Sequence, residues 1–298
     1  MTSSLASGEP QAPGVLDIPG TWNARDVGGR AVPVGATEPL RTGVLVRTAS
    51  LSQLTPEGVA ALEALGVTVD LDLRGQDEVE RDGQDVVPAT TRVVARRMDP
   101  GAGVGHALRA AGTADGPAGT PREPHGEDAD EERSADTAAM IGRLLGAEDP
   151  QGLARAMMHG VYATFVTDPT IRRTVGEALG DVADADGAVV VHCSAGKDRT
   201  GWIVALVQHV CGVGAQDRLA EYLASGAAVE GLEALIPPIP GLDKDALTPL
   251  LGVEPAYLQD AWALAEEEFG SIDGYLDACG AGPATRAKIA RKFAAQGV

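Results

Sequence analysis

The sequence is short of cysteine, of basic residues and of long apolar runs, and each shortage excludes a class of protein. Three cysteines in 298 residues, Cys193, Cys211 and Cys279, are too few and too far apart for a disulfide framework. Lys and Arg number 24 against 43 Asp and Glu, so the formal net charge is −19. A field of this sign repels nucleic acid and anionic membranes, and we expect no nucleic-acid partner.

Neither a membrane span nor a signal peptide is visible. No stretch approaches the roughly 18 consecutive apolar residues that a spanning helix needs. Residues 1–20 are rich in Ser, Gly and Pro, and they contain no Lys, no Arg and no apolar core segment. We therefore expect a disordered tail over 1–20, no integral membrane association and, with an odd number of thiols, a cytoplasmic location.

Apolar runs and helix signals alternate along the chain. Strands are predicted at Val44–Val46, Val67–Leu73, Arg92–Ala95 and Ala188–His192, the last built on three consecutive valines as in parallel strands buried on both faces. Between the first two, Thr55 and Pro56 are typical of a helix start. The pattern predicts an α/β fold, with a central, mainly parallel sheet flanked by helices.

One domain is expected over residues 21–298, with a helical region from Ala215 to the end. Within it, about 101–143 has a different composition: Gly, Ala, Pro and Thr dominate 101–120, and 123–132 contains six acids. This composition predicts a flexible insertion, which is either a lid or solvated disorder.

The strongest chemical signal is the segment His192–Gly201, His-Cys-Ser-Ala-Gly-Lys-Asp-Arg-Thr-Gly, which lies between a predicted strand and a predicted helix. Such a loop points successive N–H groups inward and, with the helix N-terminus, forms a cradle for a tetrahedral dianion. The same cradle stabilises a thiolate, so Cys193 is the expected nucleophile. The planar fork of Arg199 suits two phosphate oxygens, and Thr200 can donate a hydrogen bond to the leaving sulfur.

No metal and no cofactor is expected, because no second His or Cys lies at ligand spacing from His192. His192 is instead expected to orient the loop and to help keep the thiolate charged. The residues expected to bind phosphate are Ser194, Ala195, Gly196, Lys197, Asp198 and Arg199.

The decapeptide resembles the phosphate-binding loop of cysteine-dependent protein tyrosine phosphatases, and its Gly-Lys-Asp-Arg-Thr-Gly part resembles the bacterial PtpB-like branch. The similarity runs from Trp22 to about Lys292, apart from the insertion. Further segments resemble motifs of that branch: Asn23–Gly29, with Ala24 in place of an aromatic residue, Arg47–Ala49, Asp72–Arg74 followed by Glu78, Glu221–Ser225, and Phe269–Ser271 with Tyr275 and Leu276.

The resemblance implies hydrolysis of phosphate monoesters in two steps without a metal. In that scheme Cys193 attacks phosphorus, a general acid protonates the leaving oxygen, and water hydrolyses the intermediate. An Asp after the third strand supplies the acid in the branch, and Asp99 falls at that place. Asp198, inside the loop, is the competing candidate; Asp99 is favoured because the acid must face the thiolate from across the site.

Four further residues are expected to support the site by ion pairs rather than to touch substrate: Arg25, Asp26, Arg47 and Arg74. Asp72 and Glu78 are the expected partners of these arginines.

Phosphotyrosine in proteins is the first expected substrate, with phosphoserine and phosphothreonine as further ones. Lys197 adds a second cation to the loop, as in relatives that accept phosphoinositides, although the net charge of −19 opposes docking on an anionic bilayer. One alternative is a phosphatase-like module that binds phosphorylated partners without turnover. Another is a sulfur-transfer or arsenate-reducing enzyme, which would need a resolving thiol. The oligomeric state and secretion without a signal peptide stay open.

Overall fold

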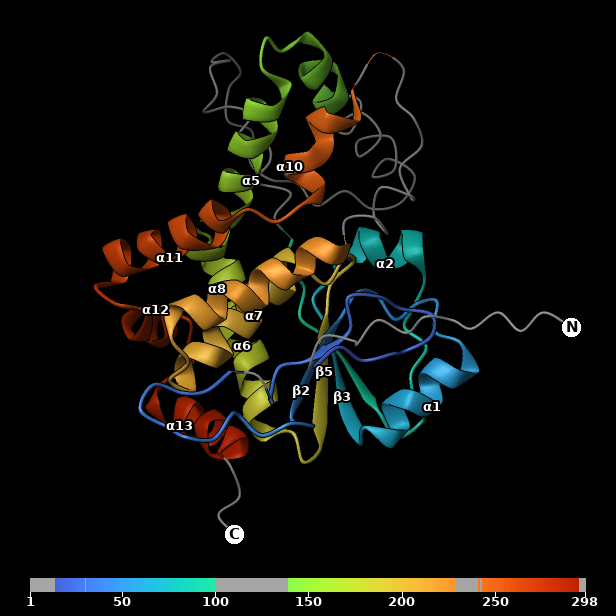
Figure 1. Cartoon of the computed structure of the whole chain (residues 1–298), viewed down its shortest axis with the longest axis vertical. Coiled ribbons are helices and arrows are strands. Elements are labelled where there is room, and N and C mark those ends of the chain that lie inside the picture. The colour runs from blue at the N-terminus through green and yellow to red at the C-terminus, as the bar shows by residue number, and fades with distance from the viewer. Residues whose placement is uncertain (1–13, 30, 100–138, 229–240, 242, 295–298) are drawn as a thin grey trace, which may run out of the picture.

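The fold is built on a five-stranded sheet in the order β1-β2-β5-β3-β4 (Figure 1). The computed structural model describes residues 14–29, 31–99, 139–228, 241 and 243–294. Every strand pair is parallel except β1 with β2, which confirms the predicted mainly parallel sheet. The strands are β1 (Arg25–Asp26), β2 (Leu45–Thr48), β3 (Val67–Asp72), β4 (Arg92–Ala95) and β5 (Ala188–His192).

Helices cover both faces of the sheet. In Figure 1, α1 lies on one side of the sheet, while α6, α7 and α13 lie on the other. The N-terminal half contributes α1 (Pro56–Ala64), α2 (Gln76–Asp82), a helix over 139–146, α5 (Pro150–Thr167) and α6 (Pro169–Asp184). The C-terminal half contributes α7 (Asp198–Val210), α8 (Ala215–Leu223), η1 (Ala224–Ala228), η2 (Lys244–Leu247), α10 (Thr248–Leu251), α11 (Pro255–Phe269), α12 (Ile272–Ala278) and α13 (Pro283–Phe293). The predicted helical region after Ala215 is confirmed.

Strand β5 shows why the sheet sits at the centre of the core. Val189 and Val191 pack into the apolar cluster on the α6 and α7 side, whereas Val190 packs into the cluster that contains Leu62 of α1. All three valines are fully buried. Burying a side chain of this size contributes about 1.5–3 kcal/mol to folding, so three consecutive valines fix β5 between two layers of helices.

The carboxyl ends of the parallel strands meet at one edge of the sheet, where ligands bind in folds of this kind. There Thr48 of β2 and Asp72 of β3 lie opposite His192 of β5. Helices α5 and α10 lie side by side beyond this edge (Figure 1). The predicted insertion and tail fall largely outside the described residues. No helix among the described residues has the length and apolar character to cross a bilayer.

Candidate active site

The loop between β5 and α7 carries Cys193, which is 2% exposed, and α7 begins at Asp198. The turn depends on Gly196, whose φ is +64°. A Cβ atom at this position would lie 2.1 Å from the carbonyl oxygen of Thr48. Because no side chain fits there and the φ is left-handed, the close approach of the loop to β2 requires glycine.

The carbonyl oxygens of the loop are all held by donors from the surrounding chain. The oxygen of Cys193 lies 3.2 Å from Nδ1 of His192, and that of Ser194 accepts from Ser50 N at 3.1 Å. Nδ2 of Asn23 donates to the oxygens of Ala195 and Gly196, at 3.2 and 2.9 Å. A terminal nitrogen of Arg47 donates to the oxygens of Gly196 and Lys197, at 2.5 and 3.3 Å. In a trans peptide the C=O and the following N–H point in opposite directions. Because the loop carbonyls bond the surrounding chain, the N–H groups that follow them point away from it.

Those N–H groups have no hydrogen-bond partner among the described residues. Within the part of the chain that the structure describes, no acceptor bonds the backbone N–H groups from Ser194 to Arg199. Unpaired N–H groups near the start of a helix, where the helix dipole is positive, form an anion-binding site. The loop thus has the geometry of an anion cradle with Cys193 at its start, and that it binds phosphate stays a prediction.

Arg199 is held in place by Glu78. The two terminal nitrogens of the guanidinium lie 2.5 and 2.6 Å from the two carboxylate oxygens of Glu78. Burial would raise the pKa of Glu78, but its bonds to Arg199 outweigh burial and lower that pKa to about 2. Among the described residues, Nε of Arg199 donates to no protein group, so part of the fork is available for an anion.

Comparison with known proteins decides the family. A family profile described as "Tyrosine phosphatase family" matches residues 16–295. The chain belongs to this family. The "Triple specificity protein phosphatase PtpB" of Mycobacterium tuberculosis is 33% identical over 91% of this chain and 96% of its own length. The enzyme class expected from the sequence, a phosphatase, is confirmed.

Other similar proteins match less completely. A "Putative tyrosine-protein phosphatase" of Cupriavidus necator is 32% identical over 41% of this chain and 44% of its own length. A "Tyrosine-protein phosphatase" of Nostoc commune is 28% identical over 62% of this chain and 49% of its own length. The solved structure of TpbA from P. aeruginosa, with 18% identity, covers 74% of this chain and 87% of its own at a TM-score of 0.26.

The two candidate acids of the phosphatase lie in different surroundings. Asp99 is exposed, directly after Met98, whose carbonyl oxygen accepts a hydrogen bond of 3.3 Å from Arg199. Asp198 is engaged on both oxygens, one 2.9 Å from the hydroxyl of Tyr162 and the other 3.2 Å from Nζ of Lys197. A carboxyl that shuttles a proton needs access to the leaving oxygen, which favours Asp99.

Lys197 is bound to α10. Its ammonium donates to the carbonyl oxygens of Leu250 and Gly252, at 2.7 and 2.8 Å, and the residue is 4% exposed. The predicted contact of Lys197 with phosphate stays a prediction, and in this structure the ammonium would have to leave two carbonyls to make it. Thr200 is fully buried, and its hydroxyl has no hydrogen-bond partner among the described residues.

Three of the residues expected to support the site, Arg25, Arg47 and Arg74, pair with three carboxylates. Glu221 lies 3.1 Å from Arg25 and 2.7 Å from Arg47, the arginine that holds two loop carbonyls. Arg74 pairs with Asp72 at 2.9 Å, as predicted, and with Asp85 at 2.8 Å.

Two expectations about pairing are wrong. Asp26 makes no ion pair among the described residues; its oxygens accept from the N–H groups of Gly28 and Gly43, at 2.8 and 2.7 Å, so it fixes a turn. Glu78 pairs with Arg199, not with the supporting arginines, because it lies in the first turn of α2, where its carboxylate accepts from Gly75 N and from the hydroxyl of Ser194 in the loop.

Several site residues were missed in the sequence. Asn23 and Glu221 lie within segments that resemble the family but carry no pattern that reveals their partners. Asp70 and Asp85 were missed as well. Asp70 alone left a signal, since it is a charged residue inside the strand Val67–Asp72, whose other positions are almost all buried.

Glu78→Gln tests the carboxylate that holds Arg199. The folded-state pKa of Glu78, about 2, is below its ordinary value of 4.5. Its charge therefore stabilises the fold above pH 4.5, and this contribution is lost as the pH falls towards 2. After allowance for partial exposure, we expect Glu78→Gln to lower the free energy of unfolding by about 2 kcal/mol at neutral pH. Urea unfolding as a function of pH measures this; a difference independent of pH would contradict it.

Proposed function

We propose that the phosphatase hydrolyses phosphotyrosine in proteins through a phosphocysteine intermediate on Cys193. The observation that carries this proposal is the row of N–H groups from Ser194 to Arg199, directly after a buried cysteine, that no acceptor in the described part of the chain bonds. These donors, together with Arg199, match the three equatorial oxygens of the phosphoryl group in the transition state of its transfer.

In the first step the Cys193 thiolate attacks phosphorus. A sulfur–phosphorus bond forms, the phosphorus–oxygen bond to the tyrosine ring breaks, and Asp99 gives its proton to the leaving oxygen. In the second step water attacks phosphorus and loses a proton to the Asp99 carboxylate. The sulfur–phosphorus bond breaks, phosphate leaves, and the thiolate and the protonated acid are restored. Thr200 donates to the sulfur as it leaves.

Phosphotyrosine is the substrate that the structure favours over a phosphoinositide. Lys197, the cation that would meet a second phosphate group, is bound to two carbonyls at the end of α10. The relative named a triple specificity phosphatase matches 91% of this chain, and that name supports a specificity broader than phosphotyrosine alone. Phosphate release from peptides carrying each residue, beside soluble phosphoinositides, ranks these classes.

A test of the general acid compares Asp99→Asn with Asp198→Asn. Loss of the acid is expected to lower kcat about 10²–10⁴-fold for a phosphotyrosine peptide. The loss is expected to be much smaller for p-nitrophenyl phosphate, whose leaving group needs no proton. We expect this pattern for Asp99→Asn only. The same pattern in Asp198→Asn, with Asp99→Asn nearly unaffected, would reverse the assignment.

A binding module without turnover is the alternative, and measurement of phosphate release separates it from an enzyme. Binding of vanadate or phosphopeptide without phosphate release would support the binding module.

We also propose a cytoplasmic location, since all three cysteines are free, Cys193 and Cys279 are buried, and no disulfide links them.

A further inference from the structure

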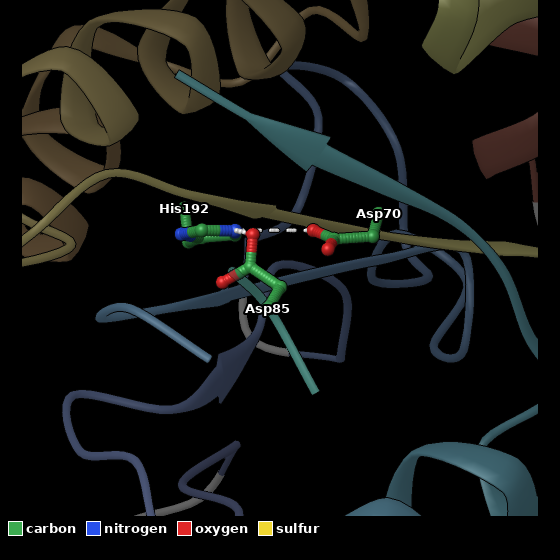
Figure 2. Close-up of side chains that lie close together, drawn as sticks. All are labelled: Asp70, Asp85 and His192. Atoms are coloured by element: carbon green, nitrogen blue, oxygen red, sulfur yellow. Dashed lines mark ion pairs between the residues drawn. The ribbon is translucent and has the colours of Figure 1, made fainter. Parts of the chain in front are cut away.

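His192, the residue before the nucleophile, lies against two acidic side chains in the interior of the protein. Its Nε2 is 3.1 Å from an oxygen of Asp70 and 3.3 Å from an oxygen of Asp85 (Figure 2). His192 and Asp70 are fully buried, and the side chain of Asp85 is 1% exposed. A charged group in such a place must be paired, because burial of an isolated charge is very costly.

Both ring nitrogens of His192 face acceptors. Nδ1 lies 3.2 Å from the carbonyl oxygen of Cys193, which can only accept a hydrogen bond. Nε2 faces two carboxylates, which also accept only, as long as they are ionised. A neutral imidazole carries a single hydrogen and would turn a lone pair towards one of these oxygens. As long as both carboxylates are ionised, the arrangement therefore calls for a proton on each nitrogen.

The charges around His192 lead to the same result. Strand β3 contributes Asp70 and Asp72, the next turn contributes Arg74, the segment after α2 contributes Asp85, and β2 places the uncharged Thr48 opposite His192. The residue after His192 in the sequence, Cys193, adds its thiol as a further ionisable group. Three carboxylates thus face a single permanent cation, Arg74.

Asp70 is the carboxylate that Arg74 leaves unpaired. Arg74 lies within 3 Å of Asp72 and Asp85. No well-directed hydrogen bond reaches either oxygen of Asp70, and among the described residues the imidazole of His192 is the one cationic group within 4 Å. A proton on His192 supplies the charge that Asp70 lacks.

We propose that Asp70, together with Asp85, keeps His192 doubly protonated and thereby fixes a positive charge directly behind the nucleophilic Cys193. Asp70 and Asp85 are positioning residues, since they act through His192 and touch no substrate. Burial alone would lower the pKa of His192, but the two facing carboxylates outweigh it and raise that pKa well above its usual range. The inference deepens the proposed function, because it concerns the charge of the same thiolate.

The protonation of His192 can be observed directly by ¹⁵N NMR on the full chain. The sequence contains five histidines, and His192→Gln assigns the signal of interest. We expect both ring nitrogens of His192 to stay protonated from about pH 6 to about pH 9. Asp70→Asn is expected to release one proton within that range. An unprotonated nitrogen at neutral pH in the parent protein would overturn the proposal. A signal that changes on addition of EDTA would also overturn it, because the site would then hold a metal ion.

The effect on Cys193 is measured by its alkylation with iodoacetamide as a function of pH, which does not depend on phosphatase turnover. Loss of the imidazolium charge in Asp70→Asn is expected to make the Cys193 thiolate less stable, so that alkylation near pH 6 slows about tenfold. Burial raises the pKa of Cys211 to about 12 and that of Cys279 to about 11, so these thiols react little.

Asp82→Asn is the matched control, since Asp82 pairs with the exposed Arg81 on the surface. An equal pH profile for Asp70→Asn and Asp82→Asn would contradict the proposal. If Asp70→Asn does not fold, the NMR of the parent protein decides alone. If both ring nitrogens of His192 are protonated but the protein releases no phosphate, this inference stands while the proposed function fails.

Discussion

Replacement of Cys193 by serine is expected to abolish phosphate release while phosphopeptide binding survives. A serine hydroxyl is ionised far less readily than a thiol, so the nucleophile is lost, and turnover falls on the order of 10⁴-fold or more. The backbone N–H groups of the loop stay in place because their orientation depends on the bound carbonyls, not on the sulfur. Phosphate release and calorimetric binding of a phosphotyrosine peptide measure the two properties separately.

Cys211→Ser is the control for this variant. Cys211 lies at the end of α7, away from the loop, and burial raises the pKa of its thiol to about 12. We expect its activity to equal that of the parent. Turnover retained in Cys193→Ser, or lost in Cys211→Ser, would show that the reactive thiol has been assigned wrongly.

The second large effect is expected from Arg199→Lys. An ammonium is a point charge and cannot reach Glu78 and two phosphate oxygens at once, whereas the guanidinium bonds Glu78 through two nitrogens and keeps Nε available. We expect kcat/KM to fall about 10³-fold, the lower end of what a transition-state arginine contributes in phosphoryl transfer. Steady-state kinetics with a phosphotyrosine peptide measures the loss.

Arg173→Lys provides the matched substitution on the surface. Arg173 is exposed on α6 and has one weak pair with Glu177, 4.0 Å away. Its replacement is expected to leave kcat/KM unchanged. A loss in Arg199→Lys no greater than in this control would contradict the role of the fork.

The sequence allowed the fold and the centre of the site to be predicted because their signals are local. Three consecutive valines predicted a strand buried on both faces, and the residues from Cys193 to Thr200 lie next to one another in the chain. Strand β5 has the predicted bounds, and the loop after it has unpaired N–H groups. Local patterns of this kind need no knowledge of distant contacts.

The rest of the site depends on contacts between distant segments. Glu78 reaches Arg199 across 121 positions of the chain, and Asn23 reaches Gly196 across 173. Ion pairs of this range are set by how the layers pack, so charge patterns along the sequence led to the wrong partner for Glu78. Lys197 shows the same limit, since its contact with the end of α10 has no counterpart in the local sequence.

The central claim, a covalent intermediate on Cys193, is tested most directly by rapid acid quenching during turnover of a labelled phosphotyrosine peptide. The account predicts phosphate on the peptide that contains Cys193, formed and lost at rates that match turnover, and no label in Cys193→Ser. Turnover with phosphate bound to another side chain, or with none bound at any time point, would contradict it.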